Sequence, residues 1–161
     1  MKSRWDNLLI ASGCSEEIRA HCAAVAGIAR EYCGCTPVDC DLVEAGSFLH
    51  DIGRSRSSGP DHAQAGAALL RDLGMDGRVC AIVERHIGAG LTADECSLLG
   101  LIPKDCVPSR IEEQIVAHAD NLVRGTERQC IERLLGDSTF LPVRIRSRIF
   151  RLAMQMELFR E

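Results

Sequence analysis

The chain has 161 residues, which is enough for one domain built around a single hydrophobic core. Hydrophobic residues make up 46% of it and charged residues 26%, a composition typical of water-soluble globular proteins, and no run approaches the roughly 18 apolar residues of a membrane span. The formal net charge of −4 argues against nucleic acid as an obligatory partner, because binding to a phosphate backbone requires a basic face.

The N-terminal stretch MKSRWDNLLIASG and the cysteines bear on the compartment. The apolar run is too short for a secretory signal, so we expect a cytoplasmic protein without membrane contact. The nine cysteines are then expected to be reduced thiols rather than disulfides. Cys33, Cys35 and Cys40 form a cluster compatible with a metal site, but they lack the paired spacing of a zinc ribbon, which favours core or surface thiols.

Helical periodicity runs through almost the whole chain. Ser15 is placed to cap a first helix with an acidic first turn, and Asp39 precedes a second helix, which Gly53 closes. Residues 61–73 and 76–87 predict two further helices, each followed by glycine.

The second half of the chain contains two capping-box patterns, Thr92 with Glu95 and Ser109 with Glu112, which predict a short helix and a long one. Residues 142–159 repeat apolar side chains at helical spacing, with arginines mostly on the other side, which favours a surface helix with a solvated basic face. No segment alternates convincingly like a strand, and no linker divides the chain. The sequence therefore predicts an all-α fold with a single domain over residues 1–161.

The stretch LHDIGRSRSSGPDH, residues 49–62, concentrates ionisable groups around one loop. Four of the five histidines of the chain stand near predicted helix ends or glycine-rich breaks, each with an acidic or small residue beside it. Imidazoles and carboxylates together suit Fe, Mn, Co or Zn, whereas a site dominated by oxygen suits Mg or Ca. Because these residues come from separate helices, their spacing alone does not assemble a site.

His21, then His50-Asp51 followed by Ile-Gly, then Asp120 in AHADNLV, resemble the H…HD…D signature of the HD-domain metal-dependent phosphohydrolases. His62 in GPDHAQAGA and His86 in AIVERHIGAG lie where the two-metal branch of that superfamily carries its extra ligands. That branch includes HD-GYP cyclic-dinucleotide phosphodiesterases and bacterial diadenosine tetraphosphate hydrolases, and the similarity to the second group is the closer one. The chain as a whole most resembles small stand-alone HDIG proteins of archaea.

The resemblance implies an HD-domain fold with a metal-site core over about residues 15–130 and a C-terminal helical extension over about 138–161. It also implies two divalent transition metals, with Fe or Mn favoured and Zn, Co, Ni or Mg as alternatives. One metal receives four ligands: His21, His50, Asp51 and Asp120. The other receives three: His62, His86 and Asp51, which bridges the two metals. Such a pair shares a hydroxide and presents it in line to a phosphorus atom, which makes Asp51 the central catalytic residue.

Three arginines are candidates for binding the substrate. Arg54 follows the central motif where HD-GYP proteins carry Lys, which suits it to the phosphate oxygens. Arg124 and Arg128 are expected one and two helical turns beyond Asp120 on the same face, and an ordinary role as surface arginines is equally open for them. The loop over residues 54–60, rich in Ser and Gly, is expected to form a rim over the substrate.

Two further residues are better explained by structural roles. His118 lies about 200° around a helix from Asp120, so it is expected to be packed rather than to bind the same metal. Glu17 lies one turn before His21, where some HD-GYP proteins bind a third metal. An acidic first turn favoured by the helix dipole is the preferred explanation for Glu17.

The leading functional expectation is a metal-dependent phosphohydrolase that acts on a small phosphorylated molecule, with a nucleotide favoured. One alternative is a diiron HD-domain oxygenase, which shares the ligand set. Another is a regulatory module that binds a nucleotide without turnover, although the intact ligand set argues against it. The sequence identifies neither the substrate nor the oligomeric state.

Overall fold

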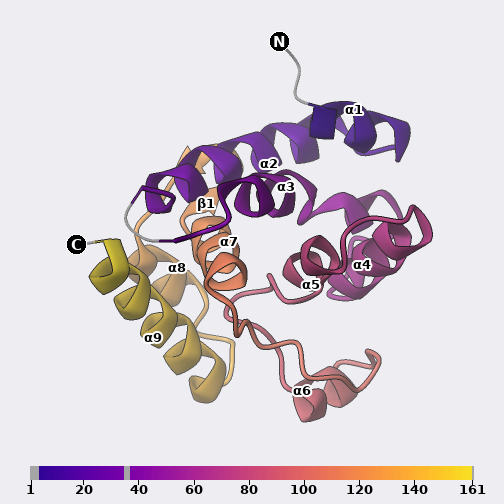
Figure 1. Ribbon diagram of the computed structural model, residues 1–161. Coiled ribbons are helices and arrows are strands. Elements are labelled where there is room, and N and C mark those ends of the chain that lie inside the picture. Colours follow the sequence, from indigo (N-terminus) through magenta and orange to yellow (C-terminus); the bar gives the residue numbers. More distant parts are fainter. Residues whose placement is uncertain (1–3, 35–36, 161) are drawn as a thin grey trace.

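The computed structural model describes residues 4–34 and 37–160, which are mostly helical (Figure 1). The helices in chain order are α1 Arg4–Ala11, α2 Glu16–Ala29, α3 Cys40–Leu49, α4 His62–Asp72, α5 Gly77–Glu84, α6 Ala93–Leu98, α7 Ile111–Asn121, α8 Ile131–Asp137 and α9 Val143–Arg160. The shorter elements are two 3-10 helices, η1 Arg30–Tyr32 and η2 Ile52–Ser55, and an antiparallel hairpin of β1 Val123–Arg124 and β2 Glu127–Arg128.

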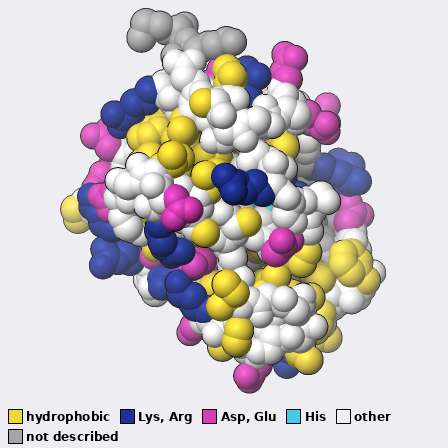
Figure 2. Space-filling view, turned by 90° about the vertical axis from the view of Figure 1, so that its right-hand side faces the viewer, with side chains coloured by type: hydrophobic (Ala, Val, Ile, Leu, Met, Phe, Trp, Pro, Cys, Tyr) yellow, Lys and Arg dark blue, Asp and Glu magenta, His cyan; other side chains and the backbone are white. Residues whose placement is uncertain are grey.

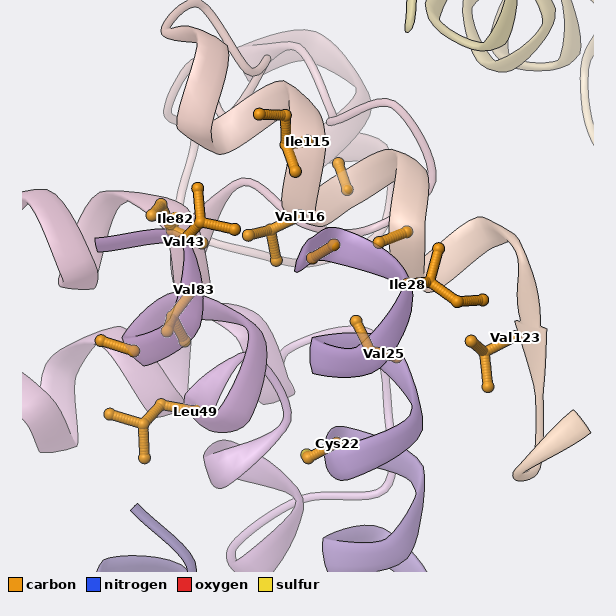
Figure 3. Close-up of a cluster of buried hydrophobic side chains, with 14 of the residues drawn as sticks. Cys22, Val25, Ile28, Val43, Leu49, Ile82, Val83, Ile115, Val116 and Val123 are labelled. Carbon is orange, nitrogen blue, oxygen red and sulfur yellow. The ribbon is translucent and has the colours of Figure 1, made fainter. Parts of the chain in front are cut away.

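Helix α7 runs through the middle of the domain, with α8 and α9 on one side and α4 and α5 on the other (Figure 1). It packs against α2, α3, α5 and α9. Figure 3 shows the centre of this core, where Val25 of α2 and Val43 of α3 face Val116 of α7 and Val83 of α5. The result is the single-domain all-α fold that the periodicity predicts, with the hairpin as a minor addition.

Most predicted helix boundaries are confirmed. The side chain of Ser15 accepts a hydrogen bond from the backbone N–H of Ile18, and that of Asp39 accepts one from Leu42. Thr92 and Glu95 form the expected capping box. Helix α5 ends at Glu84, three residues before the predicted end, which leaves His86 just outside the helix.

The second capping box was predicted one residue too early. Helix α7 begins at Ile111, and the carboxylate of Glu113, not of Glu112, accepts hydrogen bonds from the backbone N–H groups of Ser109 (2.8 Å) and Arg110 (3.2 Å). Glu113 is the buried member of the two and is also paired with Arg85 at 2.9 Å. A tertiary ion pair therefore selects which glutamate caps the helix.

Gly53 does not act as the helix terminator that the sequence suggested. It lies inside η2, where a Cβ atom would stand 1.9 Å from the backbone oxygen of His62 and 2.6 Å from the backbone nitrogen of Gly66. The glycine is required because η2 packs backbone against backbone on the first turn of α4. This close approach holds His62 beside the segment that carries Asp51.

Helix α9 is less solvated than its arginines suggested. Ile149, Leu152 and Met156 lie in the main core. Arg148 donates two hydrogen bonds of 2.9 Å to Glu95 and one of 2.7 Å to the backbone oxygen of Gly90. The prediction of a solvated basic face is therefore wrong for Arg148, which joins α9 to α6.

Glu95→Gln should remove part of the pH dependence of stability. Hydrogen bonds from Arg148 lower the pKa of Glu95 to about 2 against the opposing effect of burial. This stabilisation is fully present above the ordinary value of 4.5 and is lost as the pH falls toward 2, which amounts to about 2 kcal/mol between pH 6 and pH 3. Urea unfolding at pH 6 and pH 3 measures it. Equal loss of stability on acidification in wild type, Glu95→Gln and the exposed-carboxylate control Glu127→Gln would contradict the assignment.

No helix in the described ranges is both long and apolar enough to cross a membrane. The eight cysteines within these ranges are free thiols. Among the three clustered cysteines, Cys40 donates to the backbone oxygen of Cys33 at 3.4 Å, and Cys35 lies outside the described residues.

Candidate metal centre

Four imidazoles and two carboxylates from distant parts of the chain lie close together in the fold. His21 lies in the middle of α2 and Asp120 in the last turn of α7, whereas the other four stand at or just beyond the ends of short elements. These four are His50 after α3, Asp51 before η2, His62 at the start of α4 and His86 beyond α5.

The first group of donor atoms surrounds Asp120. Its Oδ1 atom lies 3.0 Å from Nε2 of His21 and 3.5 Å from Nε2 of His50. Oδ2 of Asp51 completes the group, at 3.9 Å from Nε2 of His21 and 3.7 Å from Nε2 of His50. This set matches the first metal that the resemblance implies, and His21, His50 and Asp120 alone offer three ligand atoms within 4.8 Å of one another.

The second group surrounds the other oxygen of Asp51. Its Oδ1 atom lies 3.1 Å from Nε2 of His62 and 3.5 Å from Nε2 of His86. Oδ2 lies 3.7 Å from Nε2 of His50 and 3.9 Å from Nε2 of His21, so the two oxygens of one carboxylate face different imidazoles. Asp51 therefore has the orientation that a bridging ligand requires. His50 stands between the two groups, because its ligand atom also lies within 4.8 Å of those of Asp51 and His86.

All four rings are held by the same kind of hydrogen bond. The Nδ1 atom of each histidine lies 2.7–2.8 Å from a backbone oxygen: Gly125 for His21, Ser47 for His50, Gly59 for His62 and Val83 for His86. A carbonyl accepts only, so each Nδ1 carries the proton and each Nε2 lone pair faces inward.

In this tautomer each Nε2 atom is a hydrogen-bond acceptor, and it faces other acceptors: a second Nε2 atom or a carboxylate oxygen. Nε2 of His62 and Nε2 of His86 are 3.1 Å apart, and neither neutral ring has a proton to share there. Nε2 of His50 and Oδ1 of Asp51 are buried without a hydrogen-bond partner among the described residues. Buried lone pairs that converge in this way fit divalent cations of the Fe, Mn or Zn type.

The pKa values of the aspartates and of His86 also favour divalent cations at this centre. Burial opposes ionisation of Asp51, but the neighbouring imidazoles of His50, His62 and His86 outweigh it and hold its pKa well below the usual range. Asp120 behaves alike, because His50 and His21 outweigh its desolvation and lower its pKa. Burial lowers the pKa of His86, which keeps that ring neutral. The acidic neighbours of His50 raise its pKa against the effect of burial, so a cation bound there would displace a proton. Ionised carboxylates and neutral imidazoles are the forms that bind metals.

Arg54 lies at the mouth of this centre. Its Nε atom pairs with Oδ2 of Asp51 at 2.8 Å. A cavity of about 400 Å³ opens there and is lined by Glu17, His21, Asp51, Arg54 and Ser58, among others. Ser58 places the predicted rim loop beside the cavity, and Glu17 faces the same space.

Arg124 and Arg128 do not continue the face of α7 that carries Asp120. The helix ends at Asn121, and Gly125 turns the chain with a φ of 63° into the hairpin, so the predicted helical spacing is wrong. Arg124 pairs with Asp137 at 2.8 Å, and Arg128 pairs with Glu31 at 2.7 Å.

His118→Ala should keep the metal and lose only stability, by about 1–3 kcal/mol. The His118 ring is buried against Tyr32, with centroids 5.6 Å apart, and its Nε2 atom lies 3.5 Å from the carboxylate of Glu157. His86→Ala is the matched comparison, because that ring is equally buried but faces Asp51. Metal content and urea unfolding should separate the two variants. A folded His118→Ala protein without metal would contradict this placement.

The sequence reasoning missed the groups that orient the rings. Three of the four carbonyls stand three residues before their histidine: Ser47, Gly59 and Val83. That spacing is readable in a sequence once a turn is known to precede each ring. The fourth, Gly125, is contributed by the unpredicted hairpin.

The sequence of the chain is similar to one protein family and to several archaeal proteins. The family model of the HD domain matches residues 18–125. An uncharacterized protein of Methanocaldococcus jannaschii is 49% identical over 127 residues, covering 76% of this chain and 75% of its own. Two tRNA (cytidine(56)-2′-O)-methyltransferases, of Picrophilus torridus and Thermoplasma volcanium, are 48% and 45% identical over 72% and 81% of this chain. The match spans only 34% and 39% of their length.

Solved structures show the fold. The HD domain of L. monocytogenes phosphodiesterase PgpH in complex with cyclic-di-AMP superposes with a TM-score of 0.62 at 15% identity, over 96% of this chain and 95% of that one. A second structure of the same domain gives a TM-score of 0.60 at 15% identity, over 98% of both chains. The family model, the helical arrangement and the archaeal relatives agree: this chain belongs to the HD-domain family.

Proposed function

We propose that the chain is a metal-dependent phosphohydrolase that holds two divalent cations and acts on a nucleotide or a related small phosphoester. The observation that carries the proposal is the orientation of the four histidines, each with Nδ1 bound to a carbonyl and Nε2 directed at Asp51 or Asp120. The two oxygens of Asp51 divide these nitrogens into two sets, which supports two cations rather than one.

Two cations held there would supply positive charge to a phosphoryl group and acidify a water for attack on phosphorus. Asp51 and Asp120 offset part of that charge as ionised carboxylates. The backbone carbonyls fix the four imidazole rings with Nε2 facing inward. Arg54 stands at the mouth with a side chain that is 37% exposed, so its guanidinium can hold a non-bridging phosphate oxygen. We give this role to Arg54 alone, because Arg54 lines the mouth cavity, whereas Arg124 and Arg128 do not.

A nucleotide substrate is supported by two observations. The mouth cavity of about 400 Å³ has the size of a small-ligand site. The L. monocytogenes HD domain was solved with cyclic-di-AMP. The methyltransferase relatives act on tRNA by name, so phosphorylated ends of RNA nucleotides belong among the substrates to be tested.

The test is a screen on full-length chain purified without oxygen and supplied with Mn²⁺ or Fe²⁺. Elemental analysis should find about two metals per chain. The screen covers mono- and dinucleotide phosphoesters, including cyclic dinucleotides and 2′,3′-cyclic nucleotides. We expect the protein to hydrolyse at least one of them, at equal rates with and without air. Turnover that requires O₂ would instead indicate the diiron oxygenase. Nucleotide binding without turnover in the two-metal protein would indicate a regulatory module.

A further inference from the structure

A second cavity, of about 440 Å³, lies apart from the mouth of the metal centre. It is enclosed by α6, by the chain from α8 into α9, and by three short segments around Pro60, Gly88 and Asn121. None of the six candidate metal ligands lines it. In Figure 1 its walls α6 and α9 form the lower part of the molecule, and hydrophobic side chains are exposed at that end in Figure 2.

The walls are almost entirely aliphatic. Leu91, Leu134, Ile145 and Ile149 are typical of them, and no aromatic side chain lines the cavity. The amide of Asn121, one of its few polar groups, donates to the backbone oxygen of Gly88 at 2.7 Å. The cavity therefore provides no aromatic stacking surface for a nucleobase, and its aliphatic walls suit a saturated chain.

The rim of this cavity carries a net positive charge. Glu95 is the only acidic residue in the lining, and two hydrogen bonds from Arg148 already neutralise it. Arg144 approaches the same carboxylate at 3.1 Å through Nε, so it adds a second positive charge. Its side chain is 59% exposed, which leaves the far end of the guanidinium accessible at the rim.

The entrance is apolar and uncovered. Leu98 and Leu99 line the cavity, yet they are 77% and 49% exposed. Phe140 and Val143, next to the lining residues Leu141 and Pro142, are exposed as well. A cluster of large exposed hydrophobic side chains at a cavity mouth is typical of a binding site.

We propose that this cavity binds an anionic amphiphile, with one aliphatic chain inside the cavity and a carboxylate or phosphate head at Arg144. The walls select the chain by burial of apolar surface, and the rim selects an anion over a cation. A cavity of about 440 Å³ has room for one such aliphatic chain, and its open entrance admits the chain from solution. The proposal is independent of hydrolysis at the metal centre, because the two cavities share no lining residue.

Calorimetric titration of the full chain with decanoate, below its micelle concentration, tests the proposal. We expect saturable 1:1 binding of decanoate and much weaker binding of decyltrimethylammonium. Arg144→Ala should weaken decanoate binding about three- to tenfold and leave 1-decanol unchanged. Arg151→Ala, an exposed arginine two turns along α9 that is not part of this lining, is the matched control.

Leu141→Trp, at a loop position in the lining, should fill the cavity and abolish binding of both decanoate and 1-decanol. Circular dichroism confirms that the variant is folded. Equal affinity for the cationic ligand, or unchanged binding to a folded Leu141→Trp protein, would overturn the proposal. Binding only to anionic phospholipid vesicles, or a concentration-dependent dimer that buries Leu98 in place of the ligand, would overturn it too.

Discussion

Asp51→Asn is expected to abolish turnover while the helical fold remains intact. Asn keeps the shape of the side chain but removes its negative charge, and its amide NH₂ does not bind a cation. Because Oδ1 and Oδ2 of Asp51 face different pairs of histidines, the substitution disturbs both cation sites at once. We expect a loss of several orders of magnitude in kcat, with the metal content reduced or halved.

Arg54→Ala is the comparison for this variant, because Arg54 contacts the same carboxylate from outside the ligand set. It should retain both metals and lose affinity for the phosphoester and part of kcat. Circular dichroism, elemental analysis and turnover of the two proteins measure the difference. An Asp51→Asn protein with two metals and near wild-type turnover would falsify the bridging role of Asp51.

Gly53→Ala is expected to cause the largest loss of stability, at least about 3 kcal/mol. The added methyl group would overlap the backbone oxygen of His62 and the backbone of Gly66, and a backbone cannot rotate away as a flexible side chain can. The first turn of α4 must then move, and it carries His62 out of reach of Asp51. Urea unfolding of the metal-free and metal-loaded proteins measures both effects.

Gly27→Ala is the matched control for the Gly53 substitution. Gly27 lies inside α2, where an added Cβ meets nothing within 4 Å. Alanine there should stabilise the protein by about 0.5–1 kcal/mol through its higher helix propensity. Equal behaviour of the two variants would show that η2 yields to the methyl group and that the close approach is not required.

The helices were predictable because their apolar spacing and their caps are local features. Ser15, Asp39 and Thr92 cap the helices for which the sequence nominated them. Glu113 replaces Glu112 as a cap because it pairs with Arg85, the residue that follows α5. The hairpin was not predictable from alternation, since each of its strands has only two residues. Its turn depends on one glycine in a left-handed conformation.

The ligand set was predicted from a family resemblance, whereas its geometry could not be. Sequence spacing does not reveal that His62 and His86 approach to 3.1 Å, or that Asp51 directs its two oxygens to different partners. The positions of Arg124 and Arg128 were mispredicted because a helix was extended beyond its real end. Side chains that follow a helix terminus depend on tertiary packing, which periodicity does not contain.

The carbonyl groups that hold the four histidine rings differ in their distance from the histidine along the chain. His50, His62 and His86 are each tied to a carbonyl three residues earlier, whereas His21 depends on Gly125, 104 residues later. Gly125 lies at the exposed tip of the hairpin, where local opening has a low free energy. Once this tip lifts, only the contact with Asp120 holds the His21 ring in place, so metal loading and loss would begin at His21, on the side of the site that the hairpin covers.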